Sequence, residues 1–581
     1  MAVEKLIVDH IDTWTTALQI RSTAGRGSSG KIDLYGIKKL RELILELAVR
    51  GKLVPQDPND EPASELLKRI AAEKAELVKQ GKIKKPKRLP EISEEGKPFE
   101  LPAGWAFGRL STLSTVITKG TTPTSVGLSF TSSGVNFIKV EDISNNKIKR
   151  SPNSQFISFE SDAILSRSKL ESGDILFSIA GTIGKTCLVS DSDLPANTNQ
   201  ALAIIRGTQK VFNAQFILFQ LNSFVSQMVK NKARGGAMPN ISLGDLNSLC
   251  LVIPPATEQI RIIEKLQKLM SLCDQLEQHS LTSLDAHQQL VETLLTTLTD
   301  SQNAHELAEN WVRISEHFDT LFTTEASIDA FEHTILQLAV TGKLSSQCYN
   351  DTNVEETLAI IHETKKDLVK KKLYQKTSVL KSKNMELIFP TYWSHTQLGE
   401  ICFSIVPNRD KPKKFSGNIP WVTLPDFPDT SLYLNTDVIN LGLSPDEIEE
   451  FKSKVAPKNS ILMSCIGRFG LTAINKHEVV TNQQIHIFVP IGNTSPEFLS
   501  YVIRSQKNIL EKNSTSTTIA YLNKSNCESI EFGFPPIEEQ QRIVQTVNEL
   551  LNICNILKSG IRKAQQTQLH LADALTDAAI N

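Results

Sequence analysis

The most constraining feature of the sequence is an internal repeat that spans two long halves. The segment ILELAVRGKL at 44–53 returns as ILQLAVTGKL at 335–344, and PPATEQIRI at 254–262 returns as PPIEEQQRI at 535–543. Because the matched segments keep their order, the chain is predicted to fold as a pseudo-dimer of two similar halves. A pseudo-dimer presents two equivalent surfaces to any partner.

Composition limits the size and the surroundings of this fold. The chain has 581 residues, 40% of them hydrophobic, which is enough to bury several cores in about three to four structural units. No apolar run approaches the roughly 18–20 residues that a membrane span needs. Glu4, Asp9 and Asp12 stand where a signal peptide would be apolar. We therefore expect a cytoplasmic protein.

The charge balance argues against a uniformly basic surface, because the formal net charge is −1. Duplex DNA, with a backbone close to two-fold symmetric, is the partner that a pseudo-dimer suits best. Binding to DNA would then have to come from local basic patches or from the help of a partner protein.

Each half is predicted to run from a helix through a basic linker and a β-rich domain to a long helix. The first helix has apolar residues at three- and four-residue spacing and a glycine after its end. These positions are Ile37, Leu40, Ile44, Leu47 and Gly51 in one half, and Ile328, Phe331, Ile335, Leu338 and Gly342 in the other. The predicted parts are a helical scaffold with its linker at 1–100, a first β-rich domain at 101–255, a central helical scaffold at 256–385, a second β-rich domain at 386–535 and a final helix at 536–581.

Both linkers are rich in basic residues. The clusters are Lys79, Lys82, Lys84, Lys85, Lys87 and Arg88 in the first half, and Lys365, Lys366, Lys370, Lys371, Lys372 and Lys376 in the second. Such clusters are usually solvated charge on a helix or a linker. Their recurrence just before each β-rich domain keeps a phosphate-facing role open.

The β-rich domains share a skeleton. Each opens on Pro-x-x-Trp, at 102–105 and 390–393, and each contains a matched strand, at 173–178 and 459–464. The tripeptide Thr-Asn-Gln also occurs in both domains, at 198–200 and 481–483. Short runs rich in β-branched and aromatic residues, separated by Gly, Pro, Asn and Ser, predict short strands between these signatures.

A Pro-Pro pair closes each domain and starts a long helix. Apolar residues then step alternately by four and three, which is a coiled-coil spacing. The seams are Ile262, Leu266, Leu269, Cys273 and Leu276 in the central helix, and Ile543, Val547, Leu550, Cys554, Leu557 and Ile561 in the last. Each helix is expected to pack on its copy. A helix of about 40 residues makes a rod of roughly 60 Å, which could hold two domains at a fixed separation.

One segment imitates a phosphate-binding loop. The sequence at 180–186 follows a predicted strand and ends in Gly-Lys-Thr, but Ile179 stands where that loop needs its first glycine. The second copy, at 467–472, keeps two glycines and has no lysine. A tight turn, which tolerates that loss, is therefore predicted for both.

Catalytic motifs are absent from the sequence. Asp446, Glu450 and Lys452 are too close to lie on two adjacent strands of a nuclease site, and 446–450 predicts the first turn of a helix. No Asn- or Asp-Pro-Pro-aromatic tetrapeptide, His-x-x-x-His pair or nucleophile elbow occurs. The eight cysteines contain no Cys-x-x-Cys pair, so neither disulfides nor a thiolate metal site is expected.

Together, these motifs resemble the specificity subunit of a type I restriction–modification system. The resemblance rests on the Gly-Lys-Leu helix ends, the Pro-x-x-Trp openings, the Gly-Asp-Ile-Leu-Phe-Ser strand with its Gly-Thr-Ile-Gly turn, and the Pro-Pro-x-x-Glu-Gln-x-x-Ile helix starts. Each kind of motif is weak alone, but all four recur in the same order. The resemblance covers nearly the whole chain, and only about 1–35 is weakly matched.

The resemblance implies an α+β fold. In it, two β-rich target-recognition domains form an internal pseudo-two-fold repeat and are separated by two long antiparallel coiled-coil helices. Each domain would read one half of a bipartite DNA target, and the divergence of the domains implies an asymmetric one. The helices would set the separation of the half-sites.

The same resemblance implies partners and cofactors. Two methyltransferase subunits would dock on the helical regions, and two motor–nuclease subunits would complete the restriction enzyme. S-adenosylmethionine, ATP and magnesium would belong to those subunits. This chain by itself is expected to have no catalytic residue, no metal and no cofactor.

Polar loops of the β-rich domains are the candidate DNA contacts, since they offer hydroxyls, charges and flexible turns. The residues are Lys119, Gly120, Thr121, Thr122, Lys139, Glu141, Asp142, Arg234, Gly235, Gly236 and Asn240 in the first domain, and Asn408, Arg409, Lys411, Thr423, Asp426, Ser514, Thr515, Ser516 and Thr517 in the second. The alternative function is that of a helical adaptor that binds only protein, which the near-zero net charge leaves open.

Overall fold

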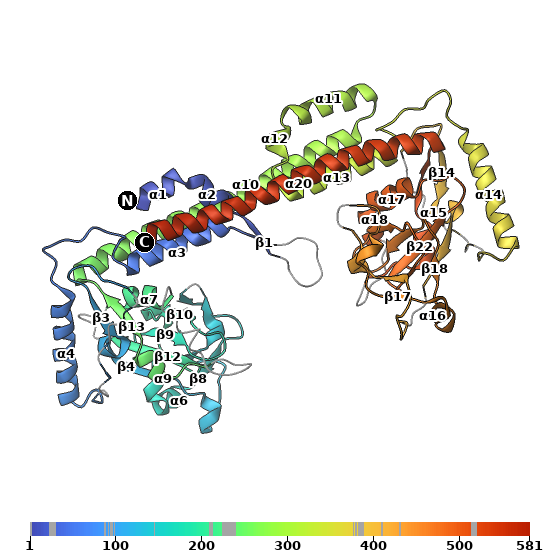
Figure 1. The fold of residues 1–581 in the computed structure, drawn as a ribbon. Helices are drawn as coiled ribbons and strands as arrows, with labels where there is room; N and C mark the ends of the chain where they lie inside the picture. The colour runs from blue at the N-terminus through green and yellow to red at the C-terminus, as the bar shows by residue number, and fades with distance from the viewer. Residues whose placement is uncertain are drawn as a thin grey trace. The chain divides into compact units, whose positions relative to one another are not determined.

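The computed structural model describes residues 3–21, 31–85, 89–90, 92, 97, 99–144, 146–207, 213–222, 240–375, 377, 380, 388–407, 411–428, 431–512 and 520–580. The chain divides into two compact units (Figure 1). Unit 1 contains Met1–Arg21, Lys31–Ser280 and Gln565–Asn581, and unit 2 contains Leu281–Ala564. Within the described residues, no helix has the length and apolar character needed to cross a membrane.

The helical part of unit 1 is built around α3, Tyr35–Val49, as the apolar spacing predicts. Ile37, Leu40 and Ile44 are at most 1% exposed. Gly51 follows the helix with φ +69°, a left-handed conformation that glycine adopts without strain. The other elements of this part are α1 (Val3–Asp9), α2 (Ile11–Thr16), β1 (Gln19–Arg21), β2 (Lys31–Asp33), α4 (Ala63–Lys79), the first turns of α10 (Ala256–Asp300) and the last turns of α20 (Ile537–Ile580).

Domain 1, the β-rich part of unit 1, contains a four-stranded antiparallel sheet in the order β10-β9-β12-β4 and a three-stranded sheet in the order β11-β5-β8. A separate pair, β13-β3, joins the end of the domain to its beginning. The strands are β3 (Ala106–Arg109), β4 (Ser114–Lys119), β5 (Val135–Ile138), β6 (Ile143–Ser144), β7 (Lys147–Ile148), β8 (Gln155–Ile157), β9 (Ile175–Ser178), β10 (Thr186–Leu188), β11 (Ala196–Thr198), β12 (Leu202–Gly207) and β13 (Cys250–Ile253). Its α-helices are α5 (Leu110–Leu113), α6 (Phe159–Ile164), α7 (Ala214–Asn222) and α9 (Leu243–Asn247).

Domain 2, the β-rich part of unit 2, repeats the main sheet and the closing strand pair of domain 1, whereas its second sheet has four strands, in the order β17-β16-β21-β18, instead of three. Its main sheet has the order β15-β22-β19-β20, which matches β4-β12-β9-β10 strand for strand, and the pair β14-β23 corresponds to β3-β13. The strands are β14 (Ser394–Gln397), β15 (Cys402–Ile405), β16 (Ile419–Val422), β17 (Gly442–Leu443), β18 (Val455–Ala456), β19 (Ile461–Ser464), β20 (Thr472–Ile474), β21 (Val479–Thr481), β22 (Ile485–Pro490) and β23 (Glu531–Phe534). Its helices are α15 (Leu398–Ile401), α16 (Pro445–Glu450), α17 (Pro496–Ser505), α18 (Lys507–Lys512) and α19 (Lys524–Glu528).

The helical part of unit 2 contains α13, Glu325–Val340, the second copy of α3. Gly342 follows α13 with φ +74°, as Gly51 follows α3. The remaining helices are α11 (Ala304–Glu316), α12 (Phe318–Leu321) and α14 (Val354–Lys370). The predicted α+β fold with an internal repeat is thus confirmed.

The two long helices are antiparallel, as expected, and each unit also packs a short helix against them. Unit 1 holds the start of α10 and the end of α20, whereas unit 2 holds the reverse ends. The two matched seams therefore fall in different units. In unit 2, Ile543, Val547 and Cys554 of α20 share one core with α13 and the end of α10. In unit 1, α10 pairs with α3 through Arg41, which lies 2.6 Å from Glu277.

The imitation of a phosphate-binding loop is a tight turn, as predicted. Gly181 and Gly184 have φ values of +72° and +84°, and their counterparts Gly467 and Gly470 have +74° and +77°. The acidic run at 446–450 also forms the predicted helix start: α16 is capped by Ser444, whose hydroxyl accepts a hydrogen bond from the backbone N–H of Glu447.

Candidate DNA-recognition loops

Each β-rich domain is fixed to the start of its long helix by a buried tryptophan. The indole N–H of Trp105 donates to Glu258 of α10 at 2.9 Å, and that of Trp393 donates to Glu539 of α20 at 3.1 Å. The Pro-x-x-Trp openings and the Glu-Gln helix starts are therefore two sides of one contact. Burial raises the pKa of Glu258 against the opposing effect of the Trp105 hydrogen bond.

An ion pair repeats beside this contact. Arg261 of α10 lies 2.5 Å from Asp60, and Arg542 of α20 lies 2.8 Å from Asp351. Hydrogen bonding to the arginine lowers the pKa of both aspartates. These contacts fix each domain to its long helix through the domain opening and the helix start.

Two of the basic residues near the domains are structural. Lys74 of α4 donates to the carbonyl of Ser111 at 2.6 Å, and Lys365 of α14 donates to the carbonyls of Gly399 and Cys402. Burial lowers the pKa of both lysines. A phosphate-facing role is thus wrong for Lys365. In the same cluster, Lys366, Lys370, Lys371 and Lys372 are exposed, and so are Lys79, Lys82, Lys84 and Lys85 of the first cluster, whereas Lys87, Arg88 and Lys376 lie outside the described residues.

In domain 1 the segment Lys119–Thr122 packs on the Thr-Asn-Gln turn. The N–H of Thr121 donates to the carbonyl of Thr198 at 3.1 Å, and the Thr122 hydroxyl hydrogen-bonds to the side chain of Gln200. A Cβ on Gly120 would lie 2.0 Å from the carbonyl oxygen of Thr198, so only glycine fits there. Lys119 is exposed beside this turn. The turn, Lys119 and the two threonines form one polar corner.

A short 3-10 helix, η3 (Val140–Asp142), brings Lys139 to the same corner, since β5 pairs in parallel with β11 up to Ile138 and Thr198. Asp142 is buried and accepts from the N–H of Lys139 at 2.8 Å, so its present role is a helix cap. Lys139 lies 3.6 Å from the exposed carboxylate of Glu141. We call Lys119–Thr122, Lys139–Asp142 and Thr198–Gln200 the corner of domain 1.

Lys185, in the turn at 180–186 that imitates a phosphate-binding loop, stabilises the corner of domain 1. The ammonium group of Lys185 donates to the carbonyls of Val140 and Ile143, each at 3.2 Å, and so holds both ends of η3. Leu471, which packs on the core of domain 2, takes its place in the second copy. Lys185, which suggested a nucleotide site, thus stabilises η3 by hydrogen bonds, and domain 2 has no equivalent lysine at this position.

We call the equivalent region of domain 2, Thr423–Asp426 with the Thr-Asn-Gln turn at 481–483, the corner of domain 2. Thr423 and Asp426 cap the 3-10 helix Leu424–Asp426 (η6), with the Asp426 carboxylate accepting from the backbone N–H and the hydroxyl of Thr423 at 2.7 Å each. Lys411 lies over the ring of Phe415, 5.5 Å from its centroid. Three exposed lysines, at 411, 413 and 414, precede β16.

The remaining predicted contacts lie outside the described residues. These are Arg234, Gly235 and Gly236 in the first domain, and Asn408, Arg409, Ser514, Thr515, Ser516 and Thr517 in the second. Asn240 is described and exposed, and it forms a β-bridge with Ala180 at the glycine turn.

Sequence reasoning missed two side chains at the corner of domain 1 and two exposed lysines of domain 2. Exposed Arg167 donates to the Thr121 hydroxyl at 3.4 Å, and Gln200 meets Thr122. No local pattern marks Arg167, which reaches the corner only through the fold. Lys413 and Lys414 could have been found, because they extend the basic segment that begins at Lys411.

The comparison with known families decides what this repeated scaffold is. The model of the type I restriction modification DNA specificity domain matches twice, at residues 102–286 and 390–565. The chain belongs to this family. The two matches coincide with the two β-rich domains and the first parts of the two long helices. The chain is accordingly a DNA-specificity component of a type I restriction–modification system and not an enzyme by itself.

Two relatives match the chain over its full length. The chain is 44% identical to the EcoAI specificity subunit and 42% identical to the EcoEI specificity subunit, both type I restriction enzyme components of Escherichia coli, with 100% of this chain and of each relative covered. A solved HsdS subunit from Thermoanaerobacter tengcongensis is 18% identical with a TM-score of 0.40, and the match covers 83% of this chain and 98% of that one.

Proposed function

We propose that domain 1 and domain 2 each read one half of a bipartite, asymmetric DNA target, while α10 and α20 set the distance between the half-sites. The observation that carries this proposal is a contrast inside each repeat. The Trp–Glu, Asp–Arg and Lys–carbonyl contacts that mount the domains recur in both halves. The polar corners share the Thr-Asn-Gln turn and the aspartate cap of the 3-10 helix, but the side chains around them differ. A shared mounting with different corners suits two readers of different sequences.

Charge in the corners supports contact with DNA. Lys119, Arg167 and Lys139 lie at the corner of domain 1, and the exposed lysines at 411, 413 and 414 are close in sequence just before β16 in domain 2. Basic side chains position a protein on phosphates, while hydroxyl and amide groups such as those of Thr122 and Gln200 can read base edges. Local clusters of this kind serve DNA binding even at a net charge of −1.

We infer further that the helical parts dock two methyltransferase subunits and that two motor–nuclease subunits join them in the cytoplasm. S-adenosylmethionine, ATP and magnesium would be held by those subunits. The names of the full-length relatives, which are restriction enzyme subunits, support such an assembly.

A domain exchange tests the division of labour. Residues 101–253 are replaced by the corresponding domain of a related specificity subunit, the chimera is expressed with its methyltransferase subunits, and genomic methylation is mapped. One half-site is expected to change, with the other half-site and the spacer unchanged, because the mounting contacts are shared. The reciprocal exchange of 389–534 is the control and should change the other half. A change in both halves from one exchange would refute separate reading.

A point substitution tests the corner. Arg167→Ala should weaken DNA binding by the methyltransferase complex by about 1–3 kcal/mol, with a reduced salt slope if the contact is to phosphate or relaxed selection of one base if it is to a base. Lys68→Ala is the matched control, since Lys68 is an exposed cation of α4 whose side chain is 72% exposed. Equal affinities for the two variants at every salt concentration would remove Arg167 from the DNA surface.

A further inference from the structure

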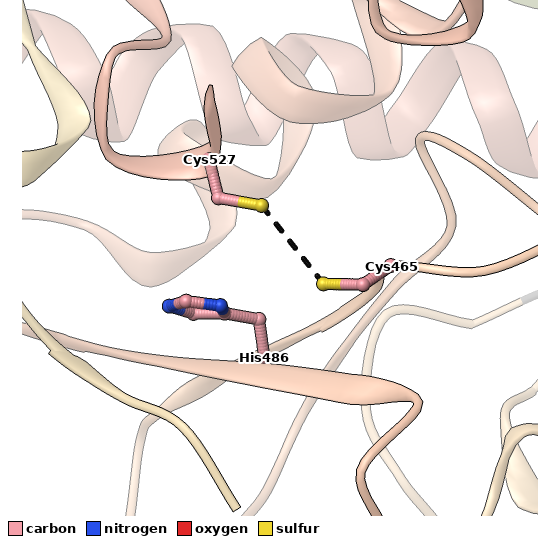
Figure 2. A group of neighbouring side chains, drawn as sticks. All are labelled: Cys465, His486 and Cys527. Atoms are coloured by element: carbon pink, nitrogen blue, oxygen red, sulfur yellow. Dashed lines mark hydrogen bonds between the residues drawn. The ribbon is translucent and has the colours of Figure 1, made fainter. Parts of the chain in front are cut away.

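Domain 2 contains a buried cluster of two cysteines and a histidine (Figure 2). Cys465 follows β19, His486 lies in β22 and Cys527 lies in α19. They are at most 3% exposed, and one potential ligand atom from each lies within 4.8 Å of the others. The sulfur atoms of the two cysteines are 3.9 Å apart. This group is not part of either corner or of the mounting contacts.

The same three positions are apolar in domain 1. Register fixes the correspondence: Leu202 pairs with Ser178 as Ile485 pairs with Ser464. The next residues along each strand are therefore equivalent, and α9 matches α19. The counterparts of Cys465, His486 and Cys527 are Ile179, Ala203 and Leu246, which are at most 3% exposed within one hydrophobic core.

The surrounding backbone is also shared. The N–H of Ile241 donates to the carbonyl of Ile179 at 2.8 Å, and the N–H of Leu522 donates to the carbonyl of Cys465 at 3.0 Å. This fold therefore needs no thiol or imidazole at these positions, since hydrocarbon fills them in domain 1. Domain 2 therefore has three potential metal ligands at positions where domain 1 has only apolar side chains.

The histidine is oriented as a ligand. Its Nε2 atom lies 2.6 Å from the hydroxyl of Ser404, a hydrogen bond that occupies this nitrogen. In Figure 2 the other ring nitrogen, next to the chain attachment, faces the two sulfur atoms. A hydrogen bond to the second nitrogen is how proteins fix the tautomer and the direction of a metal-binding histidine.

We propose that Cys465, His486 and Cys527 bind one zinc ion in domain 2. Two thiolates that bind zinc at about 2.3 Å in tetrahedral geometry stand about 3.8 Å apart, close to the 3.9 Å found here. Two thiolates and a neutral imidazole cancel the charge of Zn²⁺, so the buried site carries no net charge. Cu⁺ would leave one negative charge buried, which favours zinc. Three protein ligands are the number that zinc keeps where water occupies its fourth position.

Binding releases two protons, because each thiol must lose its proton to the solvent before its sulfur can bind the ion. The hydrogen bond with Cys527 and the neighbouring His486 lower the pKa of Cys465. Burial raises the pKa of Cys187 and Cys554, which lie outside the cluster, to about 12. The ion would tie together β19, β22 and α19, and with them the segment around Leu522.

Metal analysis of the full-length chain tests the site directly. Protein purified without chelator should contain close to one equivalent of zinc by mass spectrometry, and Co²⁺ exchanged into it should show a thiolate charge-transfer band and the d–d bands of tetrahedral coordination. Cys527→Leu should lose the metal and the bands. Cys187→Ala, which removes a buried thiol of domain 1, should keep both.

The triple variant Cys465→Ile, His486→Ala, Cys527→Leu separates metal binding from folding, because it installs the apolar set of domain 1. It should fold without zinc and show no Co²⁺ spectrum. The proposal is overturned if the wild-type chain takes up neither ion after reduction and zinc addition, if the protein purified without chelator contains copper and no zinc, or if a mass loss of two hydrogens shows a Cys465–Cys527 disulfide. Each of these measurements is independent of DNA reading.

Discussion

The two halves of the molecule share most scaffold contacts, but in one ion pair the acidic and the basic residue have exchanged helices. Lys52 donates to the carbonyl of Ile580 at the end of α20, and Lys343 donates to the carbonyls of Thr299 and Ser301 at the end of α10. The Gly-Lys-Leu motif thus supplies a lysine to a helix C-terminus in both halves, where the helix dipole favours a cation. In this contact the lysine is on the motif and the carbonyls are on the long helix in both halves.

The reversed contact lies between the short and the long scaffold helix. In unit 1, Arg41 of α3 lies 2.6 Å from Glu277 of α10, whereas in unit 2 the acid is Glu332 of α13 and the base is Lys558 of α20, 2.8 Å apart. If α3 packed on the seam of α20, Arg41 would face Lys558. The reversal therefore favours the observed partner for each short helix, although the apolar seams are alike. Each half can keep the same packing and still distinguish its own helix.

The largest expected effect comes from the glycines that both halves share. A Cβ on Gly51 would lie 2.5 Å from Pro102, and one on Gly342 would lie 2.5 Å from Pro390. Gly51→Ala and Gly342→Ala should each cost roughly 2–5 kcal/mol, from left-handed strain and overpacking. Gly81→Ala is the control, because Gly81 has φ +70° and open space around it, and it should cost only about 1–2 kcal/mol. Thermal unfolding of the three variants measures this, and equal midpoints would show that the close approach to proline has no energetic effect.

Repetition made the scaffold predictable. Gly51, Trp105 and Glu258 have copies at fixed places in the second half, and each such copy marks a position where the backbone or a buried contact allows one residue type. The apolar spacing of α3 and the start of α16 were likewise readable, because local helix signals decide them.

Contacts between distant segments were not predictable. Lys185 meets η3 and Lys365 meets α15 only after folding, and no spacing rule links a lysine to the carbonyls that it will find. Cys465, His486 and Cys527 are also too far apart in sequence for any metal-ligand motif. The short helices α3 and α13 as further partners of the long helices were also not predicted, because spacing gives the apolar face of a helix but not every neighbour that covers it.

A second, smaller effect on stability should differ between the Trp393–Glu539 and the Trp105–Glu258 contacts. Glu539 accepts from Trp393, Tyr392 and Ser345, so Glu539→Gln should cost about 1–3 kcal/mol at pH 7. Burial raises the folded-state pKa of Glu258 above its usual value of 4.5. The folded state then binds more protons, and the stability of unit 1 falls as pH rises from about 4.5 through the folded pKa. Glu258→Gln should remove that fall.

Hydrogen exchange of peptides from each unit, recorded between pH 4 and pH 7 and corrected for the intrinsic exchange rate, measures this difference. The Glu258→Gln variant should gain protection relative to the wild type as pH rises, and only in unit 1. Parallel pH profiles for the variant and the wild type would show that the Trp105 hydrogen bond fully offsets the burial of Glu258.

The smallest expected effect concerns the reversed ion pair. Lys558 is 15% and Glu332 24% exposed, so solvent screens the pair in part, and a double-mutant cycle should give a coupling of about 0.5–1 kcal/mol. Lys558→Glu alone should lower the thermal midpoint of unit 2, because Asp329 and Glu332 would then face a like charge. The combined Glu332→Lys, Lys558→Glu change should recover most of this loss.

The combined change should nevertheless reduce the choice between partners, because it gives unit 2 the polarity of unit 1. An α3 helix could then accept the seam of α20 in a second molecule as readily as that of α10. We expect a larger share of higher-mass species after refolding at high protein concentration, measured by light scattering, at nearly unchanged stability. The reverse pair Arg41→Glu, Glu277→Arg should behave alike, since it also makes the two polarities equal. If both combined variants refold as cleanly as the wild type, apolar packing alone selects the helix partners and the reversal has no role in assembly.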